Sequence, residues 1–311
     1  MPETTLPLEA ATTRTSPAAP AAVTLDDLPP AEKKSSLSVG AWLSIGWLAT
    51  ITLASVLAPL FLADPLAADP FKARSGPEGM ALLGYDELGR DLFSRMVNGA
   101  KWTLLIAVGA VAIGVLVGGL LGLIAGYFRG RIDAVLSPSF NILLAFPQLV
   151  LALLLVSVFA NGAQDSVGKR VFVLIIALGI IAIPLLARIT RANTLAWAER
   201  DFVMAAKAMG AKPGRVLFRD VLPNVLPAMM AITLLAVGIA IVAEAGLAFL
   251  DLGVKLPTPS WGNIMAQGKK ELRRVPMMVI APTIFIFLTV MSLNYLGDVI
   301  QKRFNVRESL L

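Results

Sequence analysis

Six long apolar runs, separated by short polar segments, dominate the pattern of this chain. A helix needs about 20 consecutive apolar residues to cross the roughly 30 Å hydrocarbon core of a bilayer. The first three runs contain no charged residue at all. The pattern therefore predicts an all-α integral membrane protein with six transmembrane helices, at roughly residues 38–62, 102–128, 135–160, 171–189, 225–250 and 276–298.

Composition agrees with a membrane protein and removes most enzyme chemistry. Of 311 residues, 57% are hydrophobic and 15% are charged, whereas soluble domains average roughly 45–50% and 25%. Cysteine and histidine are absent, so thiolate or imidazole metal sites, disulfides, cysteine nucleophiles and histidine acid–base catalysis are excluded. We expect no catalytic residue, bound metal or cofactor. The net charge of +6 comes mostly from residues beside the apolar runs, which indicates contact with lipid headgroups rather than nucleic acid.

The flanking charges also favour an orientation. With the amino terminus inside, 15 of the 27 lysines and arginines fall on the inner side, where such residues are enriched. Lys269, Lys270, Arg273 and Arg274 oppose this assignment. We expect a multi-pass protein with both termini cytoplasmic. Its predicted parts are a disordered tail at 1–36, rich in Ala, Pro, Thr and Ser, a first transmembrane helix with an extracellular segment at 37–100, and a five-helix core at 101–311.

One basic, amphipathic segment, residues 188–223, interrupts the apolar pattern. Phe202, Ala206 and Met209 recur at helical spacing, and Gly210 stands where a helix would end in a left-handed cap. A second short helix is expected to begin after Pro213 and to end at Pro223, before the fifth span. The segment is therefore predicted to be a helix-turn-helix elbow on the cytoplasmic face.

The elbow resembles a known family. Ala205-Ala206, then Gly210, then Leu222-Pro223 are similar to the EAA loop of binding-protein-dependent ABC importer permeases, with Met204 where that loop usually begins with Glu. Two further stretches, at 84–95 and 244–263, resemble the dipeptide/oligopeptide/nickel branch, specifically its second, "C"-type subunit. The resemblance extends from Asp86 nearly to the carboxyl terminus.

The resemblance implies a type I ABC importer permease fold in which the loop at 188–223 contains a coupling helix that seats on a cytoplasmic ATPase. It implies a bacterial plasma membrane subunit that forms half of a pore with a second permease, served by two ATPases and an external substrate-binding protein. ATP and Mg would be used by the ATPases, since no Gly-x-x-x-x-Gly-Lys-Ser/Thr phosphate loop occurs here. The ATPase-docking candidates are Phe202, Ala205, Ala206, Met209, Gly210, Phe218, Leu222 and Pro223.

Two further groups of residues are candidates for a pore or a contact between subunits. Glu244 lies inside a span, where an ionisable group is costly without a partner, and Asp251 follows seven residues later on the same helical face. Glu244 is expected either to line the pore or to pair with an arginine or backbone amide between subunits. A four-residue repeat of small residues predicts close helix packing, or a face that slides during gating: Gly114, Gly118, Gly122 and Gly126.

At the extracellular side, residues 86–95 are expected to form a short interfacial helix that receives the binding protein or simply leads into the second span. Trp261 is expected to be an interfacial anchor or part of an outer gate. The candidates there are Asp86, Glu87, Arg90 and Trp261. An ion-coupled secondary transporter without an ATPase remains the alternative function, and the transported solute, whether dipeptide, oligopeptide, nickel complex or another, stays open.

Overall fold

A computed structural model describes residues 38–159 and 166–308, with side chains as far as Phe304. The tail predicted at residues 1–36 lies outside the described residues. Within the described ranges the secondary structure is helical apart from turns and two isolated bridges. The principal helices are α1 (Val39–Phe61), α2 (Leu92–Ile113), α3 (Gly119–Phe128), α4 (Gly130–Ala145), α5 (Gln148–Phe159), α6 (Val167–Ala198), α7 (Asp201–Ala208), α8 (Pro213–Val216), α9 (Leu222–Phe249), α10 (Trp261–Glu271) and α11 (Met277–Glu308).

Five continuous helices are long and apolar enough to cross a membrane. The pair α4 and α5 makes a sixth if it counts as one span, although the two helices meet at an angle of 89°. The break falls at Phe146, which is extended (φ −75°, ψ 137°). Pro147 explains it, because a proline disfavours helical geometry in the residue before it. The six predicted runs are thus all found, one of them as a bent pair.

Helix ends differ from the sequence prediction. The second span begins at Leu92 rather than near residue 102, because the side chain of Asp91 caps the helix by accepting hydrogen bonds from the N–H groups of Phe93 and Ser94. The short interfacial helix expected at 86–95 is wrong: residues 86–90 form a turn, and Arg95 already lies in the first turns of α2.

The α2–α3 rod packs against α6 through its glycines. The rod is continuous across a π-helical segment, Gly114–Gly118. A Cβ atom at Gly118 would stand 2.4 Å from the carbonyl oxygen of Ile183, and one at Gly122 would stand 2.2 Å from that of Ala187. The four glycines are buried, so the expectation of close helix packing is confirmed, and the neighbour is a helix of the same chain.

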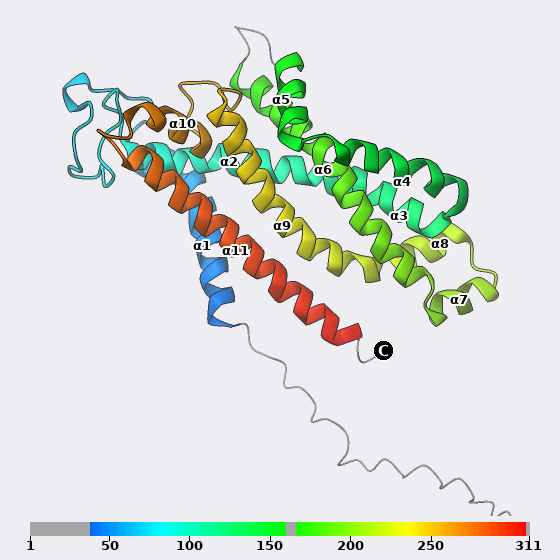
Figure 1. Cartoon of the computed structure of the whole chain (residues 1–311). Coiled ribbons are helices and arrows are strands. Elements are labelled where there is room, and N and C mark those ends of the chain that lie inside the picture. Colours follow the sequence, from blue (N-terminus) through cyan, green and yellow to red (C-terminus); the bar gives the residue numbers. More distant parts are fainter. Residues whose placement is uncertain (1–37, 160–165, 309–311) are drawn as a thin grey trace, which may run out of the picture. The chain divides into compact units, whose positions relative to one another are not determined.

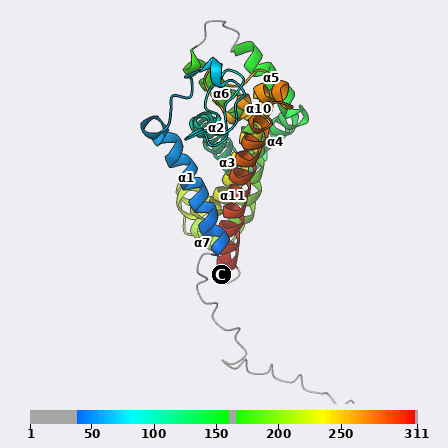
Figure 2. The ribbon, with the colours of Figure 1, turned by 90° about the vertical axis from the view of Figure 1, so that its left-hand side faces the viewer.

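The two ends of the bundle carry different elements. The first residues of α1, the short helix α7 and the last turns of α11 gather at one end, which we call the elbow end (Figures 1 and 2). The connection at 62–91 and helix α10 lie at the opposite end, the loop end. The first and the last membrane helix thus have their outer ends on the same side of the bundle, as an even number of membrane crossings requires.

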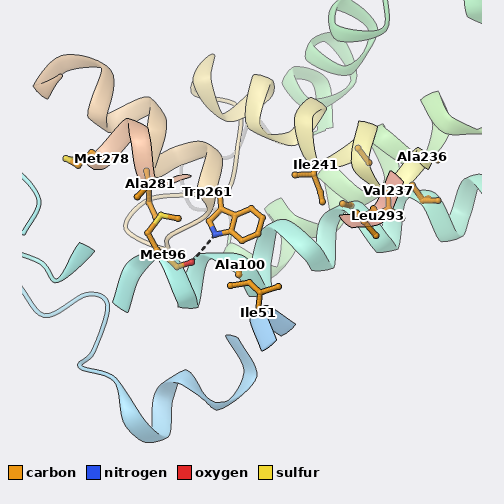
Figure 3. Close-up of a cluster of buried hydrophobic side chains, with 14 of the residues drawn as sticks. Ile51, Met96, Ala100, Ala236, Val237, Ile241, Trp261, Met278, Ala281 and Leu293 are labelled. Atoms are coloured by element: carbon orange, nitrogen blue, oxygen red, sulfur yellow. Dashed lines mark hydrogen bonds between the residues drawn. The ribbon is translucent and has the colours of Figure 1, made fainter. Parts of the chain in front are cut away.

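A buried cluster joins α10 to the bundle near the loop end. The indole of Trp261 is fully buried, and its Nε1 donates a hydrogen bond to the carbonyl oxygen of Met96 at 3.0 Å (Figure 3). Ile51, Ala100 and Ile241, from three different helices, belong to the same cluster. Trp261 is therefore a core residue, and its predicted place as an interfacial anchor is wrong.

Candidate functional site

The elbow turns on a glycine that ends α7. Gly210 has φ +81°, a conformation that side-chain-bearing residues rarely adopt. Its N–H donates to the carbonyl oxygen of Lys207 at 3.0 Å, and the next N–H, of Ala211, donates to that of Ala206 at 3.1 Å. These two bonds form a Schellman motif. The predicted left-handed cap is confirmed, and it fixes the direction in which the chain leaves α7.

After the turn the chain enters α9 without a break. Helix α8 begins with Pro213 in its first turn, continues through a π-helical segment, Leu217–Val221, and runs into α9. Pro223 lies inside this continuous rod, two residues after the π-helical segment ends, and its missing N–H removes one backbone hydrogen bond there. The expectation that Pro223 closes a separate helix is therefore wrong, and the second arm of the elbow is the beginning of the α9 rod.

The elbow has an inner face that packs on the bundle. Val203 from α7 and Val216 from α8 have no exposed surface and pack with Trp197, the last aromatic residue of α6. The other buried members of this cluster are Leu123, Leu217, Val221, Val225 and Met229. Because the cluster includes residues of α3, α6 and α9, the elbow is fixed to three membrane helices.

Away from this inner cluster, the elbow presents large apolar side chains to solvent. Phe202, Met204, Met209 and Phe218 are between 45% and 82% exposed. Of the predicted docking residues, Phe202, Ala205, Met209, Gly210, Phe218 and Pro223 are exposed, whereas Ala206 and Leu222 are half-buried against the elbow's inner cluster. The structure thus brings most of these candidates to one solvent-exposed segment of the chain.

At the loop end, the charged candidates form a buried ionic cluster. Asp86 accepts N–H hydrogen bonds from Leu88 at 2.8 Å and from Arg90 at 3.0 Å, and its carboxylate pairs with the guanidinium groups of Arg90 and Arg95. Burial opposes ionisation, but the charge of Arg95, together with Arg90 and the N–H donors, holds the pKa of Asp86 below its usual value. Arg95 also reaches Gln267 of α10 at 2.9 Å. The cluster therefore fastens the loop to α2 and α10.

This burial corrects the extracellular candidates. Asp86 and Trp261 have no exposed surface and Arg90 is almost fully buried, whereas Glu87 is half-buried. Buried side chains cannot contact an approaching protein, so a direct docking role for Asp86 and Arg90 is wrong. Their positions instead stabilise the loop that carries Glu87.

Glu244 belongs to a second buried polar junction, formed within this chain. Its Oε1 accepts a hydrogen bond from the hydroxyl of Ser260 at 3.0 Å, and its Oε2 accepts one from Thr103 at 3.3 Å. The Thr103 oxygen in turn accepts the N–H of Trp261 at 3.1 Å. The prediction that Glu244 pairs with an arginine or a backbone amide is wrong, because its two oxygens accept hydrogen bonds from two hydroxyl groups instead. With no exposed surface, the carboxylate reaches neither a pore nor another chain in this conformation.

The remaining pore candidates are placed as follows. Asp251 does not share a helical face with Glu244, because α9 ends at Phe249 and Asp251 adopts φ +63° in the turn beyond it. Its N–H and that of Leu252 donate to Ala248 and Leu247, so Asp251 takes the position that Gly210 takes after α7. The glycine face contacts α6 and lines no open surface. No group of three histidine, cysteine or acidic residues within the described ranges could hold a metal.

Several of these partners were missed in the sequence. Thr103, Ser260 and Gln267 make their key contacts with residues far away along the chain, which a local pattern cannot show. One signal was available in the sequence. Ser260 and Asn263 form a capping box at the start of α10. The backbone N–H of Asn263 donates to the Ser260 hydroxyl, and the backbone N–H of Ser260 donates to the side-chain oxygen of Asn263. The serine three residues before Asn263 approximates the Ser/Thr-x-x-Glu/Gln pattern of a capping box, with the asparagine amide in place of Glu or Gln.

The fold and these two ends define a class of membrane transport subunit. Residues 118–309 match the family described as "Binding-protein-dependent transport system inner membrane component", and the chain belongs to that family. It is a multi-pass permease subunit of an ABC importer, and it has the type I permease fold. The family described by this match is a transport component rather than an enzyme.

Individual relatives narrow the branch. The chain is 36% identical, over 74% of its length and 73% of the relative's, to the "Dipeptide transport system permease protein DppC" of Alkalihalophilus pseudofirmus. It is 34% identical, over 73% of each chain, to the "Glutathione transport system permease protein GsiD" of Pectobacterium atrosepticum. The predicted resemblance to dipeptide permeases of the C type is confirmed. A chain of the inward-facing MetNI methionine ABC transporter shares the fold, with a TM-score of 0.53 and 18% identity over 67% of this chain and 97% of that one.

Proposed function

We propose that this chain forms half of the pore of an ATP-driven importer of peptides, as a heterodimer with a second permease subunit. Two cytoplasmic ATPases would hydrolyse ATP with Mg, and an external binding protein would deliver the solute. The names of the relatives, which specify dipeptide and glutathione, support a small peptide as the substrate.

The observation that carries the proposal is the set of exposed large apolar side chains on the elbow. Leaving a large apolar side chain exposed to water, rather than burying it, costs about 1.5–3 kcal/mol of free energy. Phe202, Met204, Met209 and Phe218 are exposed along residues 201–221 of the elbow, and large apolar side chains of this kind serve as anchors in the groove of a partner protein. An ATPase seated there accounts for this exposure.

The elbow is also built to transmit a displacement. Helix α7 follows α6 after Glu199 and Arg200, and the second arm is continuous with α9. Because the inner face is packed on α3, α6 and α9, pulling on the elbow would move these helices together rather than bend a loose loop. ATP-driven closure of the ATPases would in this way change the pore from inward-facing to outward-facing.

The same proposal fixes the orientation. An ATPase works in the cytoplasm, so the elbow end would be cytoplasmic and the loop end extracellular. The start of α1 and the end of α11 lie at the elbow end (Figure 1), which supports cytoplasmic termini in a bacterial plasma membrane.

The docking residues can be tested with a double variant, Ala206→Glu with Gly210→Val. The first places a charge beside the elbow's inner cluster, against which Ala206 is half-buried, and the second disfavours the positive φ that ends α7. We expect ATPase co-purification and peptide uptake to be lost while the permease still inserts. Gly168→Val is the matched control, because a Cβ atom there meets open space and φ is not positive.

Two results would contradict the proposal. Unchanged co-purification and uptake in the double variant would remove the elbow as the docking site. Uptake into liposomes by this chain alone, driven by an ion gradient, would instead support a secondary transporter.

A further inference from the structure

The loop end carries a positive charge that its membrane topology does not explain. Lys269, Lys270, Arg273 and Arg274, which we call the basic ridge, end α10 and follow it, and all four are exposed. Lysines and arginines are enriched on the cytoplasmic side of membrane proteins, whereas this cluster lies at the end opposite the elbow. No carboxylate in the described ranges lies within ion-pair distance of Lys270, Arg273 or Arg274. The ridge therefore needs a function other than topology.

The connection at 62–91, at the same end of the bundle, presents an aromatic ring to solvent. Phe71 is 99% exposed, although the turn that carries it is tightly held. The side chain of Asp69 accepts the N–H of Phe71 at 3.1 Å, and Asp69 itself donates to the carbonyl oxygen of Gly89 at 3.2 Å. A Cβ atom at Gly89, where φ is +76°, would stand 1.8 Å from Asp69 O. These contacts hold the backbone of the turn, which keeps the exposed phenyl group at the loop surface.

An ion pair joins these two features into one surface. Arg74 Nε lies 2.8 Å from Glu271 Oε2, and its Nη2 lies 2.9 Å from Oε1, so the pair is bidentate. The hydrogen bond from Arg74 holds the pKa of Glu271 below its usual value. Arg74 itself has φ +63° and is held by an N–H bond to Asp86 O at 2.9 Å. The contact ties the loop to α10 and neutralises the carboxylate that would otherwise offset the ridge.

We propose that Phe71 and the basic ridge form the docking surface for the external binding protein, and that this protein presents an acidic cluster beside an apolar pocket. The inference rests on the proposed function, because it requires the loop end to be extracellular. Phe71 would anchor in the pocket, and the ridge would steer the acidic partner and set its register. The surface replaces the buried residues Asp86 and Arg90 as the point of contact.

A protein partner fits this surface better than anionic lipid. Phe71 lies in a loop that also carries Asp64, Asp69, Glu78 and Glu87, which anionic headgroups would repel. A binding protein with localised charge can meet the ridge while avoiding these carboxylates. The apolar anchor and the ridge then act together on one partner.

The test uses the intact complex in nanodiscs of neutral phosphatidylcholine and the purified binding protein that stimulates its ATP hydrolysis. The variants are Phe71→Ser and the triple change Lys270→Glu, Arg273→Glu and Arg274→Glu, and the control is Lys302→Glu with Arg303→Glu at the elbow end. We expect the concentration of binding protein that gives half-maximal stimulation to rise about tenfold in each loop-end variant. The control should match the wild type, and unstimulated hydrolysis should be unchanged throughout.

The dependence on ionic strength gives a second readout, which can be measured on the wild type and so does not depend on how a variant folds. High salt should raise the half-maximal concentration for the wild type and lower it for the triple variant, because screening weakens the attraction in the first case and the repulsion between like charges in the second. An unchanged half-maximal concentration in both loop-end variants overturns this inference and leaves the proposed function standing. A salt effect that appears only when anionic lipid is added assigns the ridge to headgroups and also overturns it. If no ATPase co-purifies with the wild type, the proposed function itself fails.

Discussion

The carboxylate of Glu244, in the last turns of the membrane helix α9, accepts a hydrogen bond from the hydroxyl of Ser260, the N-cap residue of α10, at 3.0 Å. One side chain thereby connects a membrane-spanning helix to the short helix at the loop end. Thr103 of α2 supplies the second donor. Three helices meet at this carboxylate, and it is buried completely.

Replacing Glu244 should show that hydrogen bonding, not charge, makes this junction stable. Glu244→Gln keeps an acceptor and adds an N–H that a rotated hydroxyl can accept, so we expect thermal stability close to wild type. Glu244→Ala leaves two buried hydroxyls without this partner, which costs about 1–3 kcal/mol. The measurement is the midpoint of thermal aggregation of the purified complex. Equal midpoints for Gln and Ala variants would show that the hydrogen bonds contribute nothing.

The sequence could predict features that depend on residues close together in the chain. The apolar runs marked the membrane spans, because their length is set by the thickness of the bilayer. Gly210 was identified as a helix end, since a left-handed cap requires a residue such as glycine whatever the rest of the fold does. The four-residue glycine repeat correctly indicated a closely packed helix face.

The burial of Trp261 and Asp86 could not be predicted in the same way. A tryptophan beside prolines and an aspartate among alternating charges both read as surface residues, because local polarity does not show which segment will cover them. Trp261 is covered by residues of α2 and α11, and Asp86 is enclosed by two arginines, one of which lies in α2. Both depend on contacts between distant segments.

The close approach of α3 and α6 predicts that Gly122 tolerates no side chain. A methyl group there would stand 2.2 Å from the carbonyl oxygen of Ala187, a backbone atom that no rotamer change can move away. We expect Gly122→Ala to reduce thermal stability by about 1–3 kcal/mol, as other overpacked sites do. Gly168→Ala, where a Cβ atom meets open space, should remain close to wild type. Normal stability of the Gly122 variant would mean that the two helices pack less closely than described.

The buried cluster at the loop end predicts a pH-dependent effect of Asp86→Asn. The pKa of Asp86 is lower in the folded protein than its unfolded value of about 3.9, so its stabilising effect is complete above that value and is lost as the pH falls through the folded pKa. At pH 7 the variant leaves two arginines without their carboxylate, a loss of about 3–5 kcal/mol.

Thermal stability measured from pH 7 downward tests this directly. The gap between wild type and Asp86→Asn should be largest near neutral pH and should narrow in acid, as the wild-type carboxyl becomes protonated. Glu78→Gln, which removes an exposed partner of Lys72, is the control and should change little at any pH. A gap of constant size down to the lowest pH at which the complex survives would show that ionisation of Asp86 is not the cause.

The elbow predicts a graded response at Gly210. Its φ of +81° is accessible to glycine, is tolerated by asparagine, and costs a β-branched residue most. Gly210→Asn should therefore keep ATPase co-purification and peptide uptake close to wild type, whereas Gly210→Val should lose both. Because nothing lies within 4 Å of the added Cβ atom, backbone conformation alone separates the two variants. Gly214→Val, in open space and without positive φ, should behave as wild type, and a loss there equal to that of Gly210→Val would point to bulk at the docking surface instead.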